Sequence, residues 1–497
     1  MTLTPETRAR QVLAQAENLR LAGRLAEAER IITPVIADYP DYYAAYHTLG
    51  LICADQDRLD DALLNLSKAN ALLPGQGITL VALSSVFLQM GSQSSAKRFV
   101  QEALAHDPNL PAARLMLASI AKDERDYELA LEAVNKALER DPNWVEARLT
   151  RAIVFSHIGR DEQAALDLQA VLNDNPKNIN ALALLISLPI EAGGKTLAET
   201  ILHSGVLDEQ TELNPIAQMF FTANVHKRLG AVATAWQAFV AGNNAQMQGQ
   251  TAQDAAKLST WQQESLQALK NRGEPRFPHH ERLPTSLFIL GASRSGKTTI
   301  ESVLSASPAI RCGYESPHMK EALTNTFSAA GFVPTAQLDL LPKELHEAFC
   351  KRYFAFLRSR LDGEAIYTNT SPLQIHNAWS LADIVPNARF IFVTRDPIDT
   401  AVRIFQTHYS SGNQYAYTVQ SALDHVHWYA DMIAACLPRF GNRAIHVDYD
   451  TFTKTPEAYR DGFEKLLSVQ IPVAQVGGIP NDFAETQSYR RLFEALL

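Results

Sequence analysis

Residues 286–300, SLFILGASRSGKTTI, combine cations, hydroxyls and glycines in a spacing that can bind phosphate. The apolar run at residues 287–290 predicts a buried strand, and the apolar spacing after Thr299 predicts a helix. Gly291 and Gly296 leave room for the intervening backbone to wrap around an anion. The loop N–H groups and the positive end of the helix would then face the phosphate oxygens. The segment therefore predicts a phosphate-binding loop between a strand and a helix.

Several side chains of this loop could contact the bound anion. Arg294 and Lys297 would supply full positive charges, and nearby hydroxyls would add hydrogen-bond donors. An ordinary Gly/Ser turn before a helix is the alternative interpretation. We predict that the phosphate is bound by Arg294, Ser295, Gly296, Lys297, Thr298 and Thr299.

The composition is that of a globular protein with more than one domain. The chain has 497 residues, 46% of them hydrophobic and 20% charged, which is enough for two or more cores. A net charge of −9 argues against broad nucleic-acid binding, so we expect no nucleic-acid partner. No secretory signal or long apolar run is visible, so we expect a cytoplasmic protein without a membrane span.

The cysteines and histidines show no metal-binding spacing. The four cysteines lie far apart in the sequence, and none forms a CxxC pair. We therefore expect reduced thiols, with neither a disulfide framework nor a zinc site. No other metal motif is present, and we expect no structural metal.

The first half of the chain carries an internal repeat of 34 residues. Prolines recur at positions 40, 74, 108, 142 and 176, and alanines recur at 28, 62, 96, 130 and 164. Two helices per 34 residues is the tetratricopeptide period. The prolines would end the second helix of each pair because they lack the N–H group, and the alanines would let paired helices approach closely.

This repeat resembles tetratricopeptide proteins from about residue 9 to residue 178. We predict a repeat domain over residues 1–179, followed by a degenerate repeat and capping helices over residues 180–270. A stacked array presents a concave groove, so we predict that it docks a protein or peptide. A spacer or a homodimerisation module is the alternative.

The sequence after residue 270 predicts a linker and then an α/β domain. Residues 271–284 are rich in proline and charge, which is typical of a linker. Over residues 285–497, helical patterns alternate with short apolar strands, including residues 388–394 and 443–447. This alternation predicts a mainly parallel sheet, so the fold class is an all-α tetratricopeptide solenoid followed by an α/β P-loop-type domain.

Ligands of parallel sheets bind beyond the carboxyl ends of the strands. Three polar segments are predicted there: the 291–299 loop, residues 395–397 and residues 448–450. Arg395 leaves a strand and precedes a helix, so its guanidinium could bind a phosphate through two hydrogen bonds. A surface arginine paired with Asp396 or Asp399 is the alternative.

Residues 287–460 resemble the sulfotransferases, most closely the bacterial type with N-terminal tetratricopeptide repeats that is related to tyrosylprotein sulfotransferases. Residues 294–301 are similar to the loop that holds the 5′-phosphosulfate of 3′-phosphoadenosine 5′-phosphosulfate (PAPS). Residues 395–400 resemble the 3′-phosphate segment, residues 409–417 its downstream sequence, and residues 447–450 the late tyrosine–acid motif.

The resemblance implies a PAPS-dependent sulfotransferase that needs no metal. Glu315 falls where the family places its catalytic base, and it would take the proton of a hydroxyl acceptor. Arg294 and Lys297 would stabilise charge on the transferred group. Arg395 would recognise the 3′-phosphate and so exclude ATP. Arg403 could add to this recognition or could block the 3′-phosphate site, and the sequence leaves both alternatives open.

The sequence departs from the family pattern at three of these positions. Lys297 stands where the family usually has threonine, and it completes a GxxxxGK[ST] string typical of nucleoside triphosphatases and kinases. Thr370 stands where the family often has lysine, and Arg403 where it prefers serine. Arg490 and Arg491 are weaker cofactor-binding candidates near the C-terminal end of the sequence.

Two other functions therefore stay open. A Mg²⁺-dependent P-loop kinase or ATPase would explain Lys297, with the metal held by Thr298 and Asp450. A non-catalytic nucleotide-binding adaptor would explain the departures at Thr370 and Arg403.

Overall fold

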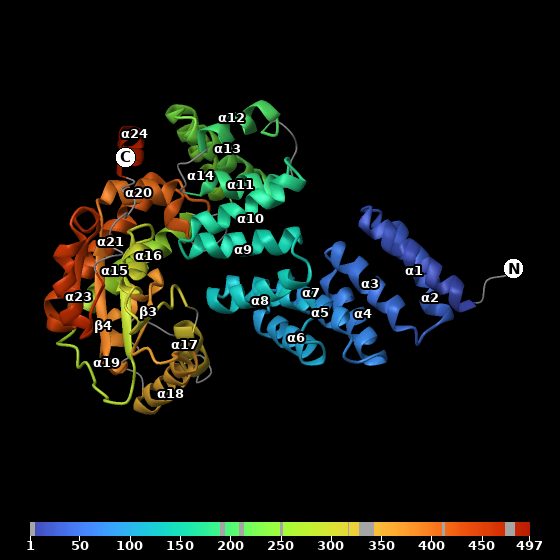
Figure 1. Ribbon diagram of the computed structural model, residues 1–497, viewed down its shortest axis with the longest axis horizontal. Helices are drawn as coiled ribbons and strands as arrows, with labels where there is room; N and C mark the ends of the chain where they lie inside the picture. Colours follow the sequence, from blue (N-terminus) through green and yellow to red (C-terminus); the bar gives the residue numbers. More distant parts are fainter. Residues whose placement is uncertain are drawn as a thin grey trace. The chain divides into compact units, whose positions relative to one another are not determined.

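Figure 1 shows the computed structural model of the chain, which divides into two compact units, residues 1–154 and residues 155–497. The structure describes residues 5–188, 194–207, 213–248, 252–316, 318–327, 342–409, 413–472 and 483–497.

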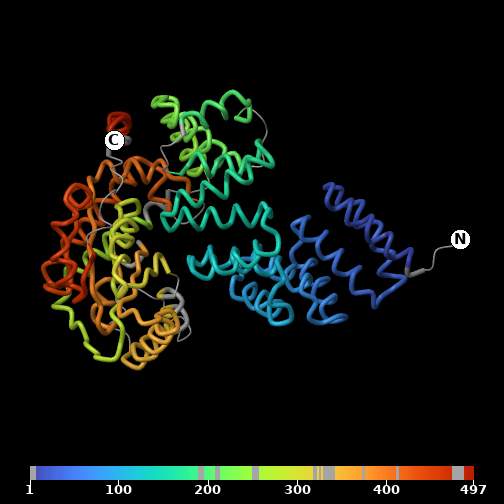
Figure 2. The backbone as a smooth tube through the Cα atoms, in the orientation of Figure 1, coloured from blue at the N-terminus to red at the C-terminus, as the bar shows by residue number. Residues whose placement is uncertain are grey.

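The first unit consists of paired helices that follow one another along the chain (Figure 2). Successive helices pack together, with α1 against α2, α3 against α4, and α7 against α8. The last helix of the series, α9, begins in the first unit and ends in the second. The helices are α1 (Pro5–Leu21), α2 (Leu25–Asp38), α3 (Tyr43–Asp55), α4 (Leu59–Leu72), α5 (Gly77–Gln89), α6 (Gln93–His106), α7 (Pro111–Asp123), α8 (Tyr127–Arg140) and α9 (Val145–His157).

The repeated alanines and prolines have the predicted structural roles. Ala28, Ala62 and Ala96 are fully buried at the fourth residue of α2, α4 and α6. Pro40 lies two residues beyond the end of α2, and the later prolines follow their helices in the same way. The structure therefore confirms the tetratricopeptide architecture that the 34-residue period predicted.

The second unit begins with six more helices, of which the last three pack into its main core. Phe220 and Trp236, on α13 and α14, belong to the same buried cluster as Phe390 of the sheet. The backbone carbonyl of Gln262 on α15 accepts a hydrogen bond of 2.9 Å from the indole of Trp428. The core thus includes helices before residue 285, where we predicted a domain boundary; that boundary stays a prediction. The six are α10 (Asp161–Asp174), α11 (Ile179–Ser187), α12 (Gly194–Ser204), α13 (Pro215–Arg228), α14 (Val232–Met247) and α15 (Ala252–Lys270).

The segment predicted as a linker lies along the α/β domain. The Phe277 N–H donates to the carbonyl of Ala382 at 3.1 Å, and its ring packs edge-on against Phe440. His279 and His280 of this segment are exposed.

The sheet of this unit has five parallel strands in the order β2-β3-β1-β4-β5. Figure 1 labels two of these strands, β3 and β4, among the helices that surround them. Leu287 and Ile289 of β1 face one buried cluster, while Phe288 and Leu290 face another. Both faces of the sheet are therefore covered, which explains the continuous apolar run of β1. The strands are β1 (Thr285–Leu290), β2 (Ile310–Arg311), β3 (Ile366–Asn369), β4 (Ala388–Thr394) and β5 (Ala444–Asp448).

Helices connect and cover these strands. Within the residues that the structure describes, none of them combines the length and the apolar character that crossing a membrane requires. The α-helices are α16 (Lys297–Leu304), α17 (His318–Phe327), α18 (Lys343–Arg360), α19 (Ala378–Ile384), α20 (Pro397–Phe405), α21 (Val419–Phe440), α22 (Tyr449–Phe452), α23 (Arg460–Leu467) and α24 (Phe483–Glu494). Short 3₁₀ helices cover Pro372–Asn377, Gln414–Ala416, Gly441–Arg443 and Pro456–Tyr459.

Candidate functional site

The phosphate loop lies between β1 and α16, as predicted. Gly296 has a φ of +95°, and a Cβ there would lie 2.1 Å from the ring of Tyr449. A Cβ on Gly291 would lie 2.6 Å from the carbonyl oxygen of Val393. Both glycines are therefore required by close approach, and Gly296 is also required by its backbone conformation.

The side chains of the loop hold charge and hydrogen-bond donors near its backbone. The Lys297 side chain is buried, and its Nζ donates to the carbonyl oxygens of Gly291 at 3.0 Å and Ala292 at 2.8 Å. The Ser295 hydroxyl is buried and makes no hydrogen bond to any described residue. Such a donor fits a loop that receives the oxygens of a phosphate or sulfate group.

The second cationic turn connects β4 to α20, and its arginines are paired with an acid. Arg395 Nε lies 2.6 Å from Asp399 Oδ2, and Arg403 Nε lies 3.1 Å from the same oxygen. The side chains of Arg395 and Asp399 are 4% and 1% exposed. Arg395 is thus a buried residue that pairs with Asp399, one of the two partners in our alternative interpretation.

The third strand-end turn, residues 448–450, joins the other two. The Arg395 guanidinium carbon lies 5.0 Å from the centre of the Tyr449 ring, which is packed against Gly296. Asp450 Oδ2 accepts a hydrogen bond of 2.8 Å from the Asp396 N–H. The three segments predicted at the carboxyl edge of the sheet therefore meet around the Tyr449 ring.

Glu315, the predicted base, lies in a turn held against the end of β3. The Tyr314 carbonyl accepts a hydrogen bond of 2.8 Å from the Thr370 N–H, and Ser316 N–H donates to the Gly313 carbonyl at 3.1 Å. The Glu315 side chain is partly exposed. Because β3 is the neighbour of β1, this turn lies on the same sheet edge as the phosphate loop.

The remaining sequence candidates are the two arginines near the C-terminal end, Arg490 and Arg491, and the segment downstream of Arg403. Arg490 on α24 reaches the second turn, with Nη1 3.3 Å from Asp396 Oδ2. Arg491 is exposed. Residues 410–412, which contribute to the resemblance downstream of Arg403, lie outside the described residues.

Sequence reasoning missed the turn between α9 and α10. A Cβ on Gly159 would lie 4.0 Å from Thr298 Cγ2, so this turn approaches the phosphate loop. Burial, and to a smaller extent Glu162, raises the pKa of Asp161 to about 6, while Arg294 acts to lower it. No sequence signal pointed to this neighbourhood, because the repeat period assigns these residues to an ordinary inter-helix turn.

A glycine-bounded loop between β1 and α16, at the carboxyl edge of a parallel sheet, defines an α/β domain of the P-loop type. Residues 284–462 match a family model described as the sulfotransferase family. Residues 111–143 match the tetratricopeptide repeat. The chain therefore contains a domain of the sulfotransferase family preceded by tetratricopeptide repeats.

Solved structures similar to this chain include several tetratricopeptide proteins. A tetratricopeptide repeat protein from Parabacteroides merdae is 17% identical, covers 50% of this chain and 96% of its own, and has a TM-score of 0.37. PilF of Pseudomonas aeruginosa is 17% identical, covers 41% of this chain and 91% of its own, and has a TM-score of 0.36. No relative was found among curated proteins.

The alternative kinase function would need a Mg²⁺ ion held by Thr298 and Asp450 together with phosphate oxygens. Within the described ranges, no three or more His, Cys, Asp or Glu side chains are grouped so as to hold a metal ion. Asp450 accepts a hydrogen bond of 2.8 Å from the Asp396 N–H, in the turn that carries Arg395.

Proposed function

We propose that the sulfotransferase family domain transfers a sulfuryl group from PAPS to a hydroxyl acceptor. The observation that carries this proposal is the meeting of the phosphate loop and the Arg395 turn around Tyr449. A nucleotide with phosphate groups at both its 5′ and 3′ positions needs two separate groups of cations. A nucleoside triphosphate needs only the first of them.

In this proposal, the phosphate loop binds the 5′-phosphosulfate. Arg294 and Lys297 stabilise the negative charge on the transferred group and on the leaving phosphate. The hydroxyls of Ser295, Thr298 and Thr299 donate hydrogen bonds, as do the backbone N–H groups at the start of α16. One preorganised donor of this kind contributes about 3 kcal/mol to lowering the barrier.

Arg395 and Arg403 bind the 3′-phosphate. Their shared partner Asp399 holds both guanidinium groups on one side of α20. A phosphate that approaches this pair gains charge-assisted hydrogen bonds, whereas ATP has no group at that position. The selectivity of the site for PAPS over ATP therefore resides in this turn.

Glu315 acts as the general base. It accepts the proton of the acceptor hydroxyl while the acceptor oxygen forms its bond to sulfur. The bond between sulfur and the bridging oxygen breaks, and adenosine 3′,5′-bisphosphate leaves. The charge on that bridging oxygen is stabilised by Lys297, since Thr370 offers no cation where the family often has lysine.

The tetratricopeptide repeats dock a protein or peptide in this proposal, which supports a macromolecular acceptor or regulator. The cytoplasmic location and the absence of a nucleic-acid partner stay predictions from the sequence. So does the possibility that the repeats form a homodimer.

The nucleotide specificity is tested by calorimetric titration of the purified protein with adenosine 3′,5′-bisphosphate and with ATP, each with and without Mg²⁺. We expect tight, metal-independent binding of the bisphosphate. Preference for ATP with Mg²⁺ would replace the proposal with the kinase or ATPase function. Binding of the bisphosphate without transfer to any acceptor in a broad screen would indicate the adaptor.

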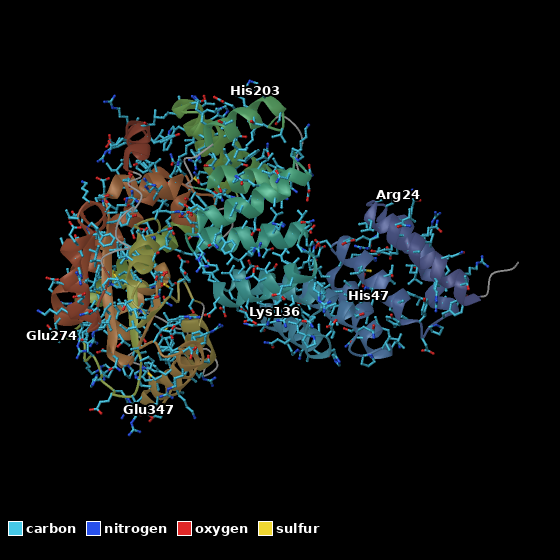
Figure 3. All side chains as sticks on the ribbon, in the orientation of Figure 1. Arg24, His47, Lys136, His203, Glu274 and Glu347 are labelled. Carbon is cyan, nitrogen blue, oxygen red and sulfur yellow. The ribbon has the colours of Figure 1, made fainter. Side chains whose placement is uncertain are left out.

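The role of Glu315 is tested by Glu315→Gln. We expect turnover to fall by about 10²–10⁴-fold, the usual contribution of a general base, with the affinity for adenosine 3′,5′-bisphosphate nearly unchanged. Glu347→Gln on α18 is the matched control, because that side chain is 70% exposed (Figure 3). Weakened nucleotide binding with unchanged turnover would show that Glu315 is not the base.

A further inference from the structure

Glu301 is a fully buried carboxyl that the proposed mechanism does not use. It lies on α16, one helical turn after Lys297, and therefore on the same face of that helix. Its Oε1 accepts a hydrogen bond of 3.0 Å from the Tyr314 N–H and another from the Thr368 hydroxyl. Its Oε2 has no partner among the described residues.

Thr368 connects the same carboxyl to β3. Its Oγ1 donates to Glu301 and accepts a hydrogen bond of 2.9 Å from the Gly313 N–H. A single carboxyl oxygen therefore joins α16, strand β3 and the turn at residues 313–316. The turn is the one that carries Glu315.

The turn has a conformation that needs such support. Tyr314 has a φ of +50°, which costs a residue with a side chain about 1 kcal/mol. A Cβ on Gly313 would lie 2.1 Å from the Thr368 carbonyl oxygen, so the turn is pressed against β3. The hydrogen bond from Tyr314 to Glu301 holds the backbone immediately before the predicted base.

The burial of Glu301 opposes its ionisation. Burial raises the pKa of Glu301 to about 7, while the hydrogen bonds from Thr368 and from the turn act to lower it. Burying a carboxyl costs free energy that an apolar side chain of the same volume would not require. The hydrogen bonds that Glu301 Oε1 accepts from Tyr314 and Thr368 offset part of this cost, and they connect α16 to the turn that carries Glu315.

We propose that Glu301 is a positioning residue that ties the phosphate-loop helix to the turn bearing Glu315. Through one turn of α16 on one side and the Tyr314 N–H on the other, it sets the separation between the bound sulfuryl group and the base. The carboxyl itself contacts neither substrate. This inference rests on the proposed function, since it assigns a distance that matters only if Glu315 acts on the acceptor.

The test compares Glu301→Gln, which keeps an acceptor oxygen, with Glu301→Met, which keeps the volume and loses it. We expect the Met variant to lose about 10²-fold in turnover, because displacing a reacting group by about 1 Å has that effect. Its affinity for adenosine 3′,5′-bisphosphate should change less than threefold, and Gln should restore most of the turnover. Glu344→Met, at an exposed position of α18, is the matched control.

Thr368→Val provides a second way to break the same connection, and it leaves the carboxyl in place. We expect it to lower turnover with unchanged nucleotide affinity, as Glu301→Met does. A Gln variant as impaired as Met, or equal losses of affinity and turnover in Met, would overturn the inference.

Hydrogen exchange of the amides at residues 313–316 separates this inference from the proposed function. It is measured on the free protein and needs no sulfuryl transfer. We expect faster exchange in Glu301→Met and wild-type exchange in Glu301→Gln. Unchanged exchange in Met would overturn the inference even if the wild-type enzyme transfers sulfate, whereas an inactive wild type with the expected exchange pattern would overturn the proposed function alone.

Discussion

The phosphate loop and the Arg395 turn both follow a parallel strand and precede a helix, yet they hold their cations differently. In the loop, backbone carbonyls accept hydrogen bonds from Lys297, and the Ser295 hydroxyl has no partner among the described residues. In the turn, the guanidinium groups of Arg395 and Arg403 share one buried carboxylate, Asp399.

This difference separates affinity from selectivity. The loop offers an anion a set of donors fixed by the backbone, so we expect it to supply most of the binding free energy. In the turn, Asp399 already offsets part of the positive charge of Arg395 and Arg403. A 3′-phosphate must therefore either displace this carboxylate or bind the two arginines together with it. We therefore expect the turn to contribute less to the binding free energy than the loop, and to favour only nucleotides that carry a 3′-phosphate.

The largest expected effect comes from Gly296→Ala, which places a side chain in the phosphate loop. The new Cβ would meet the Tyr449 ring at 2.1 Å, and the backbone would lose its φ of +95°. We expect the affinity for both ADP and adenosine 3′,5′-bisphosphate to fall by on the order of 100-fold, equivalent to two charge-assisted hydrogen bonds. Calorimetric titration of both nucleotides measures this loss.

Gly363→Ala is the matched control for that variant. Gly363 has a φ of +97°, but a Cβ there would meet no atom of the described residues within 4 Å. Because an alanine at this φ is strained, we expect Gly363→Ala to lower the stability of the protein but to leave its nucleotide affinity unchanged. Retained binding in Gly296→Ala would mean that the loop is not the main source of affinity.

The next effect concerns the acid of the second turn. Asp399→Asn removes the carboxylate that the buried Arg395 and the partly buried Arg403 share, and leaves Arg395 only the more distant Asp450 at 3.7 Å. We therefore expect the free energy of unfolding to fall by about 3 kcal/mol. The same variant should bind adenosine 3′,5′-bisphosphate more tightly relative to ADP, because the 3′-phosphate no longer competes with a carboxylate. Urea unfolding and paired titrations measure the two effects. Weaker binding of both nucleotides would show that Asp399 shapes the site.

Arg403→Ser tests the cation side of the same turn and introduces the residue that the sulfotransferases prefer there. We expect the affinity for adenosine 3′,5′-bisphosphate to fall about tenfold, the effect of one hydrogen bond to a charged group, with ADP unaffected. ADP titrated on the same preparation serves as the control. An equal loss for the two nucleotides would remove Arg403 from the 3′-phosphate site.

The smallest expected effect lies at the turn between α9 and α10. Asp161→Asn removes a carboxylate near Arg294, so we expect nucleotide affinity to rise about threefold at pH 8, the effect of one screened charge. Asp161 has a pKa of about 6, so it is protonated and neutral below that pH, and the difference between variant and wild type should vanish there. Asp174→Asn, at the exposed far end of α10, is the control. A difference that persists at pH 5 would contradict this account.

Much of the fold follows from local patterns. The 34-residue period, with its buried alanines and its prolines beyond the helix ends, predicted the repeat helices. The apolar runs of β1, β4 and β5 predicted three of the strands. Strands β2 and β3 were missed, because β2 has two residues and β3 ends in the polar pair Thr368-Asn369 rather than in an apolar run.

The candidate site was predicted only as separate segments. The rule that ligands bind at the carboxyl ends of parallel strands placed the loop, Arg395 and Tyr449 at one edge of the sheet. It did not show that the Tyr449 ring packs against Gly296, nor that Asp399 would form ion pairs with both Arg395 and Arg403. The role of Glu301 was also missed, because its partner Thr368 lies 67 residues away in the sequence.

The sequence by itself determined the features that depend on neighbouring residues: helix period, helix ends, strand hydrophobicity and the phosphate loop. These features depend on backbone sterics and on side chains within about one helical turn of each other. Only the tertiary structure decided which turns meet, that Arg395 and Arg403 share the carboxylate of Asp399, and that the carboxyl of Glu301 accepts a hydrogen bond from the turn of Glu315. Those contacts follow from how the helices pack on the sheet, which no local spacing encodes.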